Sequence, residues 1–330
     1  MTPVAPHITA WLRQRLPAEH GASPNTCDSY AYAFQLLFAF AAEHMGVAPC
    51  NLAFEQLDAP LVLAFLEHLQ RGRGNGARSR NARLAAIKSF MRFMEYREPA
   101  ALDQIRRVLA IPAHRVDVRS VRHLVLDEVQ ALLDVPDPTT RDGIRDRAFL
   151  HIAITGGLRV SELVGLKMDN LTFRGSYMDL SVLGKGRKER VLTLWKAVGD
   201  TVRAWLAVRG TVPAPELFVN VHGEALTRSG AAWILRKHVQ SATANCASLA
   251  AKSVSPHVLR HTCAMTTLQA TRDIRKVALW LGHASTQTTE IYLQVDPAEK
   301  LETLEAVIPP SLRRGTFSPP DKLIASLRGR

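Results

Sequence analysis

The chain has 330 residues, of which 47% are hydrophobic and 22% charged, and its formal net charge is +12. This length allows two ordinary domains with separate cores, and the composition excludes a largely disordered chain. Excess positive charge favours a polyanionic partner such as nucleic acid, although many basic proteins bind none.

The four cysteines are widely spaced and form no Cys-x-x-Cys pair (Cys27, Cys50, Cys246 and Cys263). Reduced thiols are therefore expected instead of a disulfide framework. No run reaches the roughly 18 apolar residues that a membrane span needs, and the first residues, MTPVAPHITAWLRQRL, lack the pattern of a signal peptide. We expect a cytoplasmic protein without membrane contact.

Residues 1–108 have the pattern of an all-helical domain. Hydrophobic spacing and start signals predict helices at about 8–16, 24–45, 58–70 and 79–96. A Gly-rich basic loop, RGRGNGARS, precedes the last of these, and seven Lys or Arg residues but no acid lie between Arg71 and Arg92. One interpretation is a solvated helix face. We favour a helix laid along a DNA backbone, where each neutralised phosphate releases counterions. The expected contacts there are Arg71, Arg73, Arg78, Arg80, Arg83 and Lys88.

Residues 109–125 contain a proline and little periodicity, and are predicted to form a linker. A second domain is expected from 126 to 306, with its first helix opened by a capping-box-like pair, Asp127 and Gln130. The two alternating runs YMDLSVL (177–183) and ERVLTL (189–194) predict a β-hairpin around GKGRK. The other predicted helices lie at about 127–134, 142–155, 196–208, 227–241, 256–270, 272–281, 288–293 and 297–306.

The predicted fold class is therefore mainly α with a small antiparallel β-sheet in the second domain (α+β). The last residues, 307–330, are expected to form a basic tail.

Two segments of the second domain place cations where they suit a phosphate. In TGGLRVSEL, two glycines end a helix and Arg159 lies in the turn before the next one, where its planar guanidinium has five donors to offer. Glu162 is expected to pair with Arg159 or with a neighbour. In GKGRKER, Lys185 lies between glycines at the hairpin tip, with Arg187 and Lys188 beside it as further DNA contacts; an ordinary polar turn is the alternative.

Two later segments add groups that can transfer protons. In SPHVLRHT, His257 and Arg260 are three residues apart and share a helix face, while His261 is expected to be structural and to lie on the opposite side. In LGHASTQTTEIYLQ, His283 follows the glycine that ends a helix. Tyr292 comes nine residues later in a short polar segment, so its hydroxyl is expected to be exposed.

These four segments, in this order, resemble the catalytic boxes of the tyrosine recombinase (phage integrase) family, which includes Xer-type and lambda-type integrases. The resemblance covers about 120–306. The first domain also resembles the core-binding (SAM-like) domain of that family, notably in SPNTCDSYAYAFQLLFAFAAE and SRNARLAAIKSFMRFM. Thr193 stands where a proline is common in the family. The resemblance implies six catalytic residues (Arg159, Lys185, His257, Arg260, His283 and Tyr292).

By this resemblance, Tyr292 attacks the scissile phosphorus and forms a 3′-phosphotyrosine, so that rejoining needs no ATP. Arg159 and Arg260 bind the non-bridging oxygens, and His283 adds a hydrogen bond there. His257 is the expected base, and Lys185 the acid that protonates the leaving 5′-oxygen. Because these cations do the work that Mg²⁺ does in other phosphoryl-transfer enzymes, neither metal nor cofactor is expected.

The resemblance also implies a nucleoid-associated protein that closes as a two-domain, C-shaped clamp around double-stranded DNA. A homo-tetramer on two DNA sites, held by exchange of the C-terminal helix, would proceed through a Holliday junction, in integration, excision or resolution. Accessory DNA-bending or partner recombinase proteins are allowed for. Two other functions fit the same fold, a type IB topoisomerase-like nicking enzyme and a catalytically idle DNA-binding regulator. An RNA-binding protein is a remote alternative, because no basic strand carries interleaved aromatics.

Overall fold

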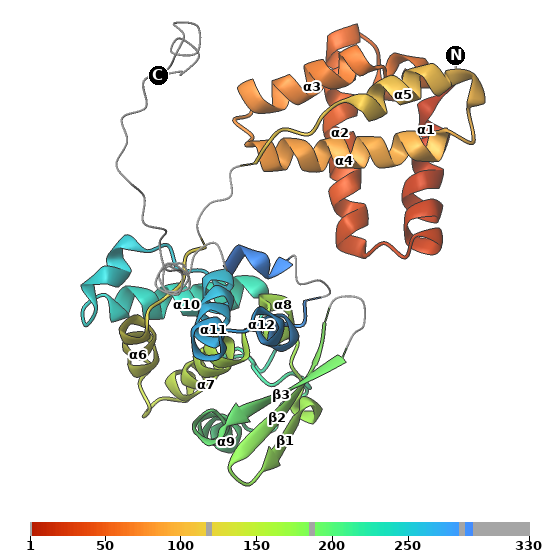
Figure 1. The fold of residues 1–330 in the computed structure, drawn as a ribbon. Helices are drawn as coiled ribbons and strands as arrows, with labels where there is room; N and C mark the ends of the chain where they lie inside the picture. The colour runs from red at the N-terminus through yellow and green to blue at the C-terminus, as the bar shows by residue number, and fades with distance from the viewer. Residues whose placement is uncertain (1, 117–120, 185–188, 284–287, 293–330) are drawn as a thin grey trace, which may run out of the picture. The chain divides into compact units, whose positions relative to one another are not determined.

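The computed structural model describes residues 2–116, 121–184, 189–283 and 288–292. The chain divides into two compact units, Met1–Val118 and Arg119–Arg330 (Figure 1). The borders expected at 108 and 126 lie on either side of this division. The helix expected at 297–306 and the basic tail lie outside the described residues.

The first unit is helical throughout. Its elements are α1 (Val4–Ala10), which continues as a π-helix (Trp11–Glu19), α2 (Pro24–Met45), α3 (Ala59–Arg71), α4 (Ala77–Met94) and α5 (Leu102–Ala110). Side-chain caps set two of the starts: the hydroxyl of Ser23 accepts from the backbone N–H of Thr26, and the carboxylate of Asp58 accepts from that of Leu61. Helix α2 ends at Gly46, which adopts the left-handed conformation.

An aromatic cluster forms the core of this unit. Trp11 meets Phe34 and Phe90 edge to face, with ring centroids 5.3 and 5.4 Å apart. The first helix was predicted at 8–16 but runs on both sides of that range, and α5 was not predicted. Val4 of α1 and Ile105 and Val108 of α5 are buried in the core of this unit, and the nine-residue α5 is a short segment in which to recognise a helical period.

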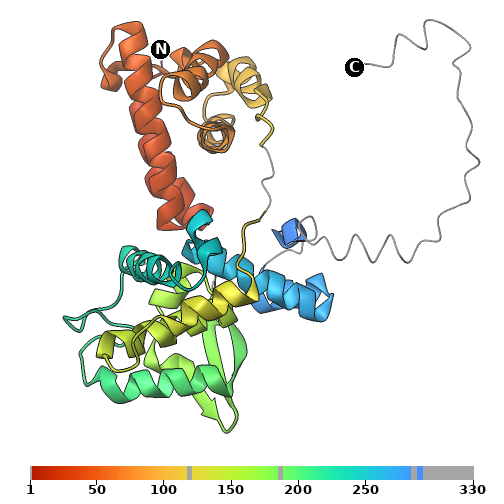
Figure 2. The same ribbon diagram turned by 90° about the vertical axis from the view of Figure 1, so that its left-hand side faces the viewer.

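The second unit packs helices around a small sheet. Its helices are α6 (Leu126–Asp134), α7 (Arg141–Gly156), α8 (Val160–Val164), α9 (Lys196–Arg209), α10 (Arg228–Ala242), α11 (Pro256–Thr271) and α12 (Ile274–Leu281), with a 3₁₀ turn at Glu290–Tyr292. The strands β1 (Leu171–Arg174), β2 (Tyr177–Leu183) and β3 (Glu189–Trp195) form an antiparallel sheet in the order β1-β2-β3. The sheet and α9 lie together at one end of the unit in both views (Figures 1 and 2).

The sheet register places one apolar face inward. Leu180 of β2 lies opposite Leu171 of β1 and Leu192 of β3, and Met178 and Leu194 are buried beside them. Helix α7, most of whose residues are buried, packs against α9 and α11 and thereby connects the sheet to the helices that carry the site. The predicted hairpin is confirmed; β1 was not predicted, because four residues give too short an alternation to recognise.

The start of α6 differs from the prediction. The helix begins one residue earlier than expected, and the carboxylate of Glu128, not Gln130, accepts from the backbone N–H of Val125 at 2.9 Å. Glu128 is buried and also receives bonds from Ser248 and Lys252. A buried carboxylate with three donors fixes the entry of the chain into this unit.

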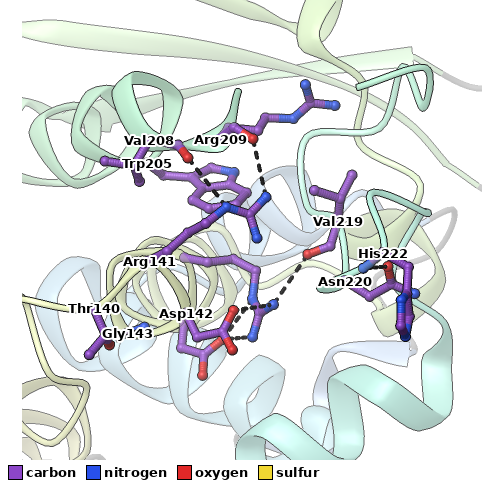
Figure 3. A network of polar contacts seen from close by, with 12 residues as sticks. Thr140, Arg141, Asp142, Gly143, Trp205, Val208, Arg209, Val219, Asn220 and His222 are labelled. Carbon is purple, nitrogen blue, oxygen red and sulfur yellow. Dashed lines mark hydrogen bonds and ion pairs between the residues drawn. The ribbon is translucent and has the colours of Figure 1, made fainter. Parts of the chain in front are cut away.

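A network of buried polar groups lies away from the four motif segments. Asp146 on α7 accepts from Arg145 and bonds to Nε2 of His238 on α10 at 2.8 Å. Nearby, the guanidinium of Arg141 lies over the ring of Trp205 and donates to the carbonyls at the end of α9 (Figure 3). These bonds tie α7 to α9 and α10. Within the described part of the chain, no helix is long and apolar enough to cross a membrane.

Candidate active site

Arg159 lies where α7 ends and α8 begins. Gly157 closes α7 with φ of +58°, and a Cβ on it would lie 2.7 Å from Cδ2 of Leu281 and 2.8 Å from Sγ of Cys263. Only glycine therefore lets the end of α7 approach α11 and α12 this closely. Arg159 is the N-cap residue of α8, with about a third of its side chain exposed.

Arg260 joins the three helices at this point. It is 3% exposed, and its guanidinium donates to the carbonyl of Gly157 at 2.5 Å and to that of Leu281 at 2.8 Å. Burial, together with the positive charge of Arg159, lowers the pKa of Arg260 to about 10. The group stays charged at neutral pH, and two carbonyls hold it in place without neutralising it.

The carboxylate of Glu162 pairs with two arginines of the site. Glu162 accepts from the backbone N–H and the guanidinium of Arg159 at 3.0 and 2.7 Å and from Nη2 of Arg190 at 2.9 Å. Burial would raise the pKa of Glu162, but hydrogen bonds from Arg190 and Arg159 hold it below its usual value. Arg260 bonds to carbonyls instead and is influenced by Glu162 through its charge alone. The three guanidinium groups and the one carboxylate together carry a formal excess of two positive charges.

Arg190 was missed as a site residue. Its partner lies 28 positions away in the sequence, and neither residue's neighbours predict the contact. One signal was available: Gly282, which ends α12 with φ of +64°, leaves no room for a Cβ, because that atom would lie 2.8 Å from Cδ of Arg190. A glycine at a helix end was taken only as a stop signal.

The two histidines of α11 lie on one face, contrary to the prediction that they oppose each other. Residues four apart are neighbours on a helix, and the rings of His257 and His261 meet edge to face with centroids 4.2 Å apart. His261 also packs against the ring of Tyr292, and its Nδ1 lies 2.8 Å from the phenolic oxygen. Its placement as a remote structural residue was therefore wrong.

Tyr292 is buried, where an exposed hydroxyl was expected. It is 2% exposed and belongs to a small apolar cluster with Cys263, Leu268 and Leu281. Burial raises the pKa of Tyr292 to about 12, against the positive charges of Arg260 and Arg159, which lower it. These influences place both guanidinium groups within electrostatic range of the phenol.

His283 lies beside the same arginines. Its Nδ1 is 2.8 Å from the hydroxyl of Thr289, which is fully buried. Burial and the nearby positive charges, Arg260 first among them, lower the pKa of His283 to about 4. The pKa of His257 is also lowered, by burial and then by Arg260 and Arg159. The imidazoles are thus neutral at pH 7 and can accept protons.

Lys185, Arg187 and Lys188 lie outside the described residues, so five of the six expected catalytic residues are placed and all five gather in the second unit. In the first unit, Arg71, Arg73 and Arg78 are exposed, with Arg71 paired to Glu67. The guanidinium of Arg83 lies over the ring of Tyr32. Burial, and then the charge of Arg92, lowers the pKa of the partly buried Lys88.

Arg80 does not match its expected role as a surface contact. It is 4% exposed, and its guanidinium donates to the carbonyl of Pro112. The neighbouring Asn81 exchanges two hydrogen bonds with the backbone of His114. Together they hold the segment after α5 against α4, so we leave Arg80 out of the proposed DNA contacts.

The residues that the structure describes include no group of three His, Cys, Asp or Glu side chains arranged to hold a metal ion. What the site offers is fixed positive charge, neutral imidazoles and a phenol. This set suits an anionic substrate and a covalent step through oxygen.

Comparison with known proteins identifies the class. Residues 122–299 match the phage integrase family, and residues 8–98 match the phage integrase N-terminal SAM-like domain. The integrase/recombinase y4rC of Sinorhizobium fredii is 44% identical over 98% of this chain and 97% of its own length. The tyrosine recombinase XerC of Pelobacter propionicus is 34% identical over 94% of this chain and 97% of its own.

Solved structures agree on the fold. The XerH site-specific recombinase bound to palindromic difH substrate matches with a TM-score of 0.67 at 22% identity, over 87% of this chain and 81% of that one. A lambda integrase tetramer bound to a Holliday junction matches with a TM-score of 0.61 at 16% identity, over 88% and 77%. The chain belongs to the phage integrase family of tyrosine recombinases, and is a site-specific recombinase.

Proposed function

We propose that Tyr292 is the nucleophile that cuts and rejoins DNA through a 3′-phosphotyrosine. The observation that carries this proposal is the excess of two positive charges around Glu162, in electrostatic range of a buried phenol. A site with uncompensated fixed cations stabilises the charge that develops on a pentacoordinate phosphorus, at no cost in reorganisation.

We assign the roles from the contacts of the described residues and from the family resemblance. Arg159 and Arg260 bind the non-bridging oxygens; Arg260 uses one donor of each terminal nitrogen on a carbonyl, and among the described residues its remaining N–H groups have no hydrogen-bond partner and can serve a phosphate. His283, held by Thr289, adds a hydrogen bond. Lys185 protonates the leaving 5′-oxygen, a role that rests on the family resemblance.

The substrate is double-stranded DNA, and the active assembly is a tetramer on two sites that passes through a Holliday junction. The lambda integrase tetramer supports this assembly by analogy of fold. The two units would close as a C-shaped clamp, with residues 297–306 exchanged between protomers. The exposed Arg71, Arg73 and Arg78 and the hairpin residues Arg187 and Lys188 would contact backbone phosphates. A cytoplasmic, nucleoid-associated enzyme of a mobile element, with accessory DNA-bending proteins, fits this assignment.

The test is covalent capture. The full chain is incubated with a library of duplexes that each carry a nick near a random site, so that a cleaved end diffuses away and the adduct accumulates. Adducts are isolated under denaturing conditions and sequenced. We expect wild type to give adducts on a defined sequence and Tyr292→Phe to give none while retaining DNA binding. Binding without adducts from wild type would contradict the proposal and favour a regulator.

The recovered site also separates recombination from relaxation. Two plasmid-borne copies should exchange strands, and truncation after Gln294 should abolish that exchange. Relaxation of a supercoiled plasmid without exchange between two sites would instead favour a topoisomerase-like activity.

A further inference from the structure

We infer that His261, not His257, accepts the proton of the attacking tyrosine. This inference rests on the proposed role of Tyr292 as the nucleophile. Nδ1 of His261 lies 2.8 Å from the phenolic oxygen of Tyr292, within the distance that a general base needs. His257 meets the ring of His261 edge to face, with centroids 4.2 Å apart, whereas it is His261 that contacts the phenol through both its Nδ1 and its ring.

The proposed role requires one tautomer of His261. The phenol can donate or accept; as the base, His261 accepts at Nδ1 in the tautomer whose Nε2 bears the proton of the neutral ring. Burial, followed by the charges of His257, Arg260, His123 and His283, lowers the pKa of His261 to about 4. The acceptor is therefore available at every pH at which the protein would act.

The step balances with two proton transfers. The O–H bond of Tyr292 breaks and its proton passes to Nδ1 of His261, while the phenolic oxygen bonds to phosphorus. The bond from phosphorus to the 5′-oxygen breaks, and that oxygen takes a proton from Lys185. On rejoining, the 5′-hydroxyl attacks phosphorus and gives its proton back to Lys185, while His261 returns its proton to the departing phenol.

The same geometry makes the nucleophile depend on DNA. Without a phosphate, the cations around His261 oppose a further positive charge on its ring, and burial holds the pKa of Tyr292 at about 12. A phosphate bound by Arg159 and Arg260 adds a negative charge that offsets this repulsion. Proton transfer thus becomes favourable only when the scissile phosphate occupies the site.

The inference is tested by single-turnover cleavage of the nicked duplex recovered by covalent capture. His261→Asn keeps an acceptor oxygen near the position of Nδ1 but takes up no proton, and His261→Phe keeps the ring packing alone. Both should lower the cleavage rate by roughly 10²-fold or more. The rate of the Asn variant should rise with pH, whereas that of wild type stays level above pH 6. Circular dichroism shows whether each variant folds.

One chemical substitution in the nucleophile and one in the DNA distinguish the proposed base, His261, from the proposed acid, Lys185. Fluorotyrosine at position 292 is a more acidic phenol, and should restore cleavage to His261→Asn but not to Lys185→Ala. A bridging sulfur in place of the 5′-oxygen needs no acid, and should restore Lys185→Ala but not His261→Asn. A His261→Asn rate within tenfold of wild type, or no restoration by fluorotyrosine, would overturn the inference. Absence of adducts from wild type would overturn the proposed function itself, and this inference with it.

Discussion

Two clusters of buried charge in the second unit differ in how their arginines are compensated. In the Asp146 cluster, Arg145 meets the carboxylates of both Asp142 and Asp146, and His238 bonds to the latter. In the Glu162 cluster, Arg159 and Arg190 pair with one carboxylate, and Arg260 bonds to backbone carbonyls instead. The first cluster satisfies its charges internally and holds helices together. The second has more guanidinium groups than carboxylates, and this uncompensated positive charge suits an anionic substrate.

The largest expected effect is on catalysis at the Glu162 cluster. Arg260→Ala removes a fixed cation from the phosphate site and should lower single-turnover cleavage by roughly 10³-fold. The matched control is Arg141→Ala, which removes a partly buried arginine that, like Arg260, donates to backbone carbonyls, here at the end of α9. It should cost about 1 kcal/mol of unfolding free energy and leave cleavage within a few-fold of wild type. Equal losses of cleavage from both variants would show that the loss does not depend on the phosphate site.

For stability we expect the opposite ranking: substitutions in the Asp146 cluster should lower the free energy of unfolding more than substitutions in the Glu162 cluster. Asp146→Ala leaves Arg145 and His238 buried without their shared acceptor, and should lower the free energy of unfolding by about 3–5 kcal/mol. Urea denaturation measures this change. Arg190→Ala in the Glu162 cluster, where Arg159 still neutralises the carboxylate, should cost less than half as much. A larger loss from Arg190→Ala would mean that the Glu162 cluster is the structural one.

A smaller effect is expected from Gly157→Ala. The new Cβ meets Leu281 and Cys263 at less than 3 Å in a left-handed conformation, so unfolding free energy should fall by about 3 kcal/mol. Gly21→Ala is the control, because Gly21 has the same φ of +58° but no atom within 4 Å of its Cβ position. It should cost only about 1 kcal/mol. Equal losses would show that the junction of α7, α11 and α12 tolerates expansion.

The smallest effect concerns pH. His261 and His283 have pKa values of about 4 in the folded protein, below the roughly 6.5 of an unfolded chain. Between these values the unfolded state binds more protons, so the free energy of unfolding should fall as pH is lowered from 6.5 to 4. The fall should be about 1 kcal/mol or more, and smaller in His261→Phe. An equal fall in that variant would contradict the low pKa of His261.

Local signals predicted the elements far better than they predicted the site. The bounds of α2 and the hairpin strands follow from caps, glycines and alternation that lie within each segment. The contact of Arg190 with Glu162 and that of His261 with Tyr292 join residues 28 and 31 positions apart, which no local pattern encodes. The misplacement of His261 was avoidable, because a separation of four residues already puts it on the face of His257.

The burial of Tyr292 also escaped prediction. Its neighbours Thr288, Thr289 and Glu290 suggested an exposed segment, but Thr289 is fully buried against His283 and the phenol completes the apolar cluster with Cys263 and Leu281. A polar sequence does not indicate exposure when its hydroxyls find partners inside the protein.

The central claim is that the unbalanced charge around Glu162 holds the scissile phosphate beside Tyr292. A crystal structure of Tyr292→Phe bound to the recovered duplex tests it most directly. We expect guanidinium nitrogens of both Arg159 and Arg260 to lie within hydrogen-bond distance of the non-bridging oxygens of one phosphate, with the ring at position 292 facing its phosphorus. A scissile phosphate bound elsewhere, with neither guanidinium touching it, would contradict the account.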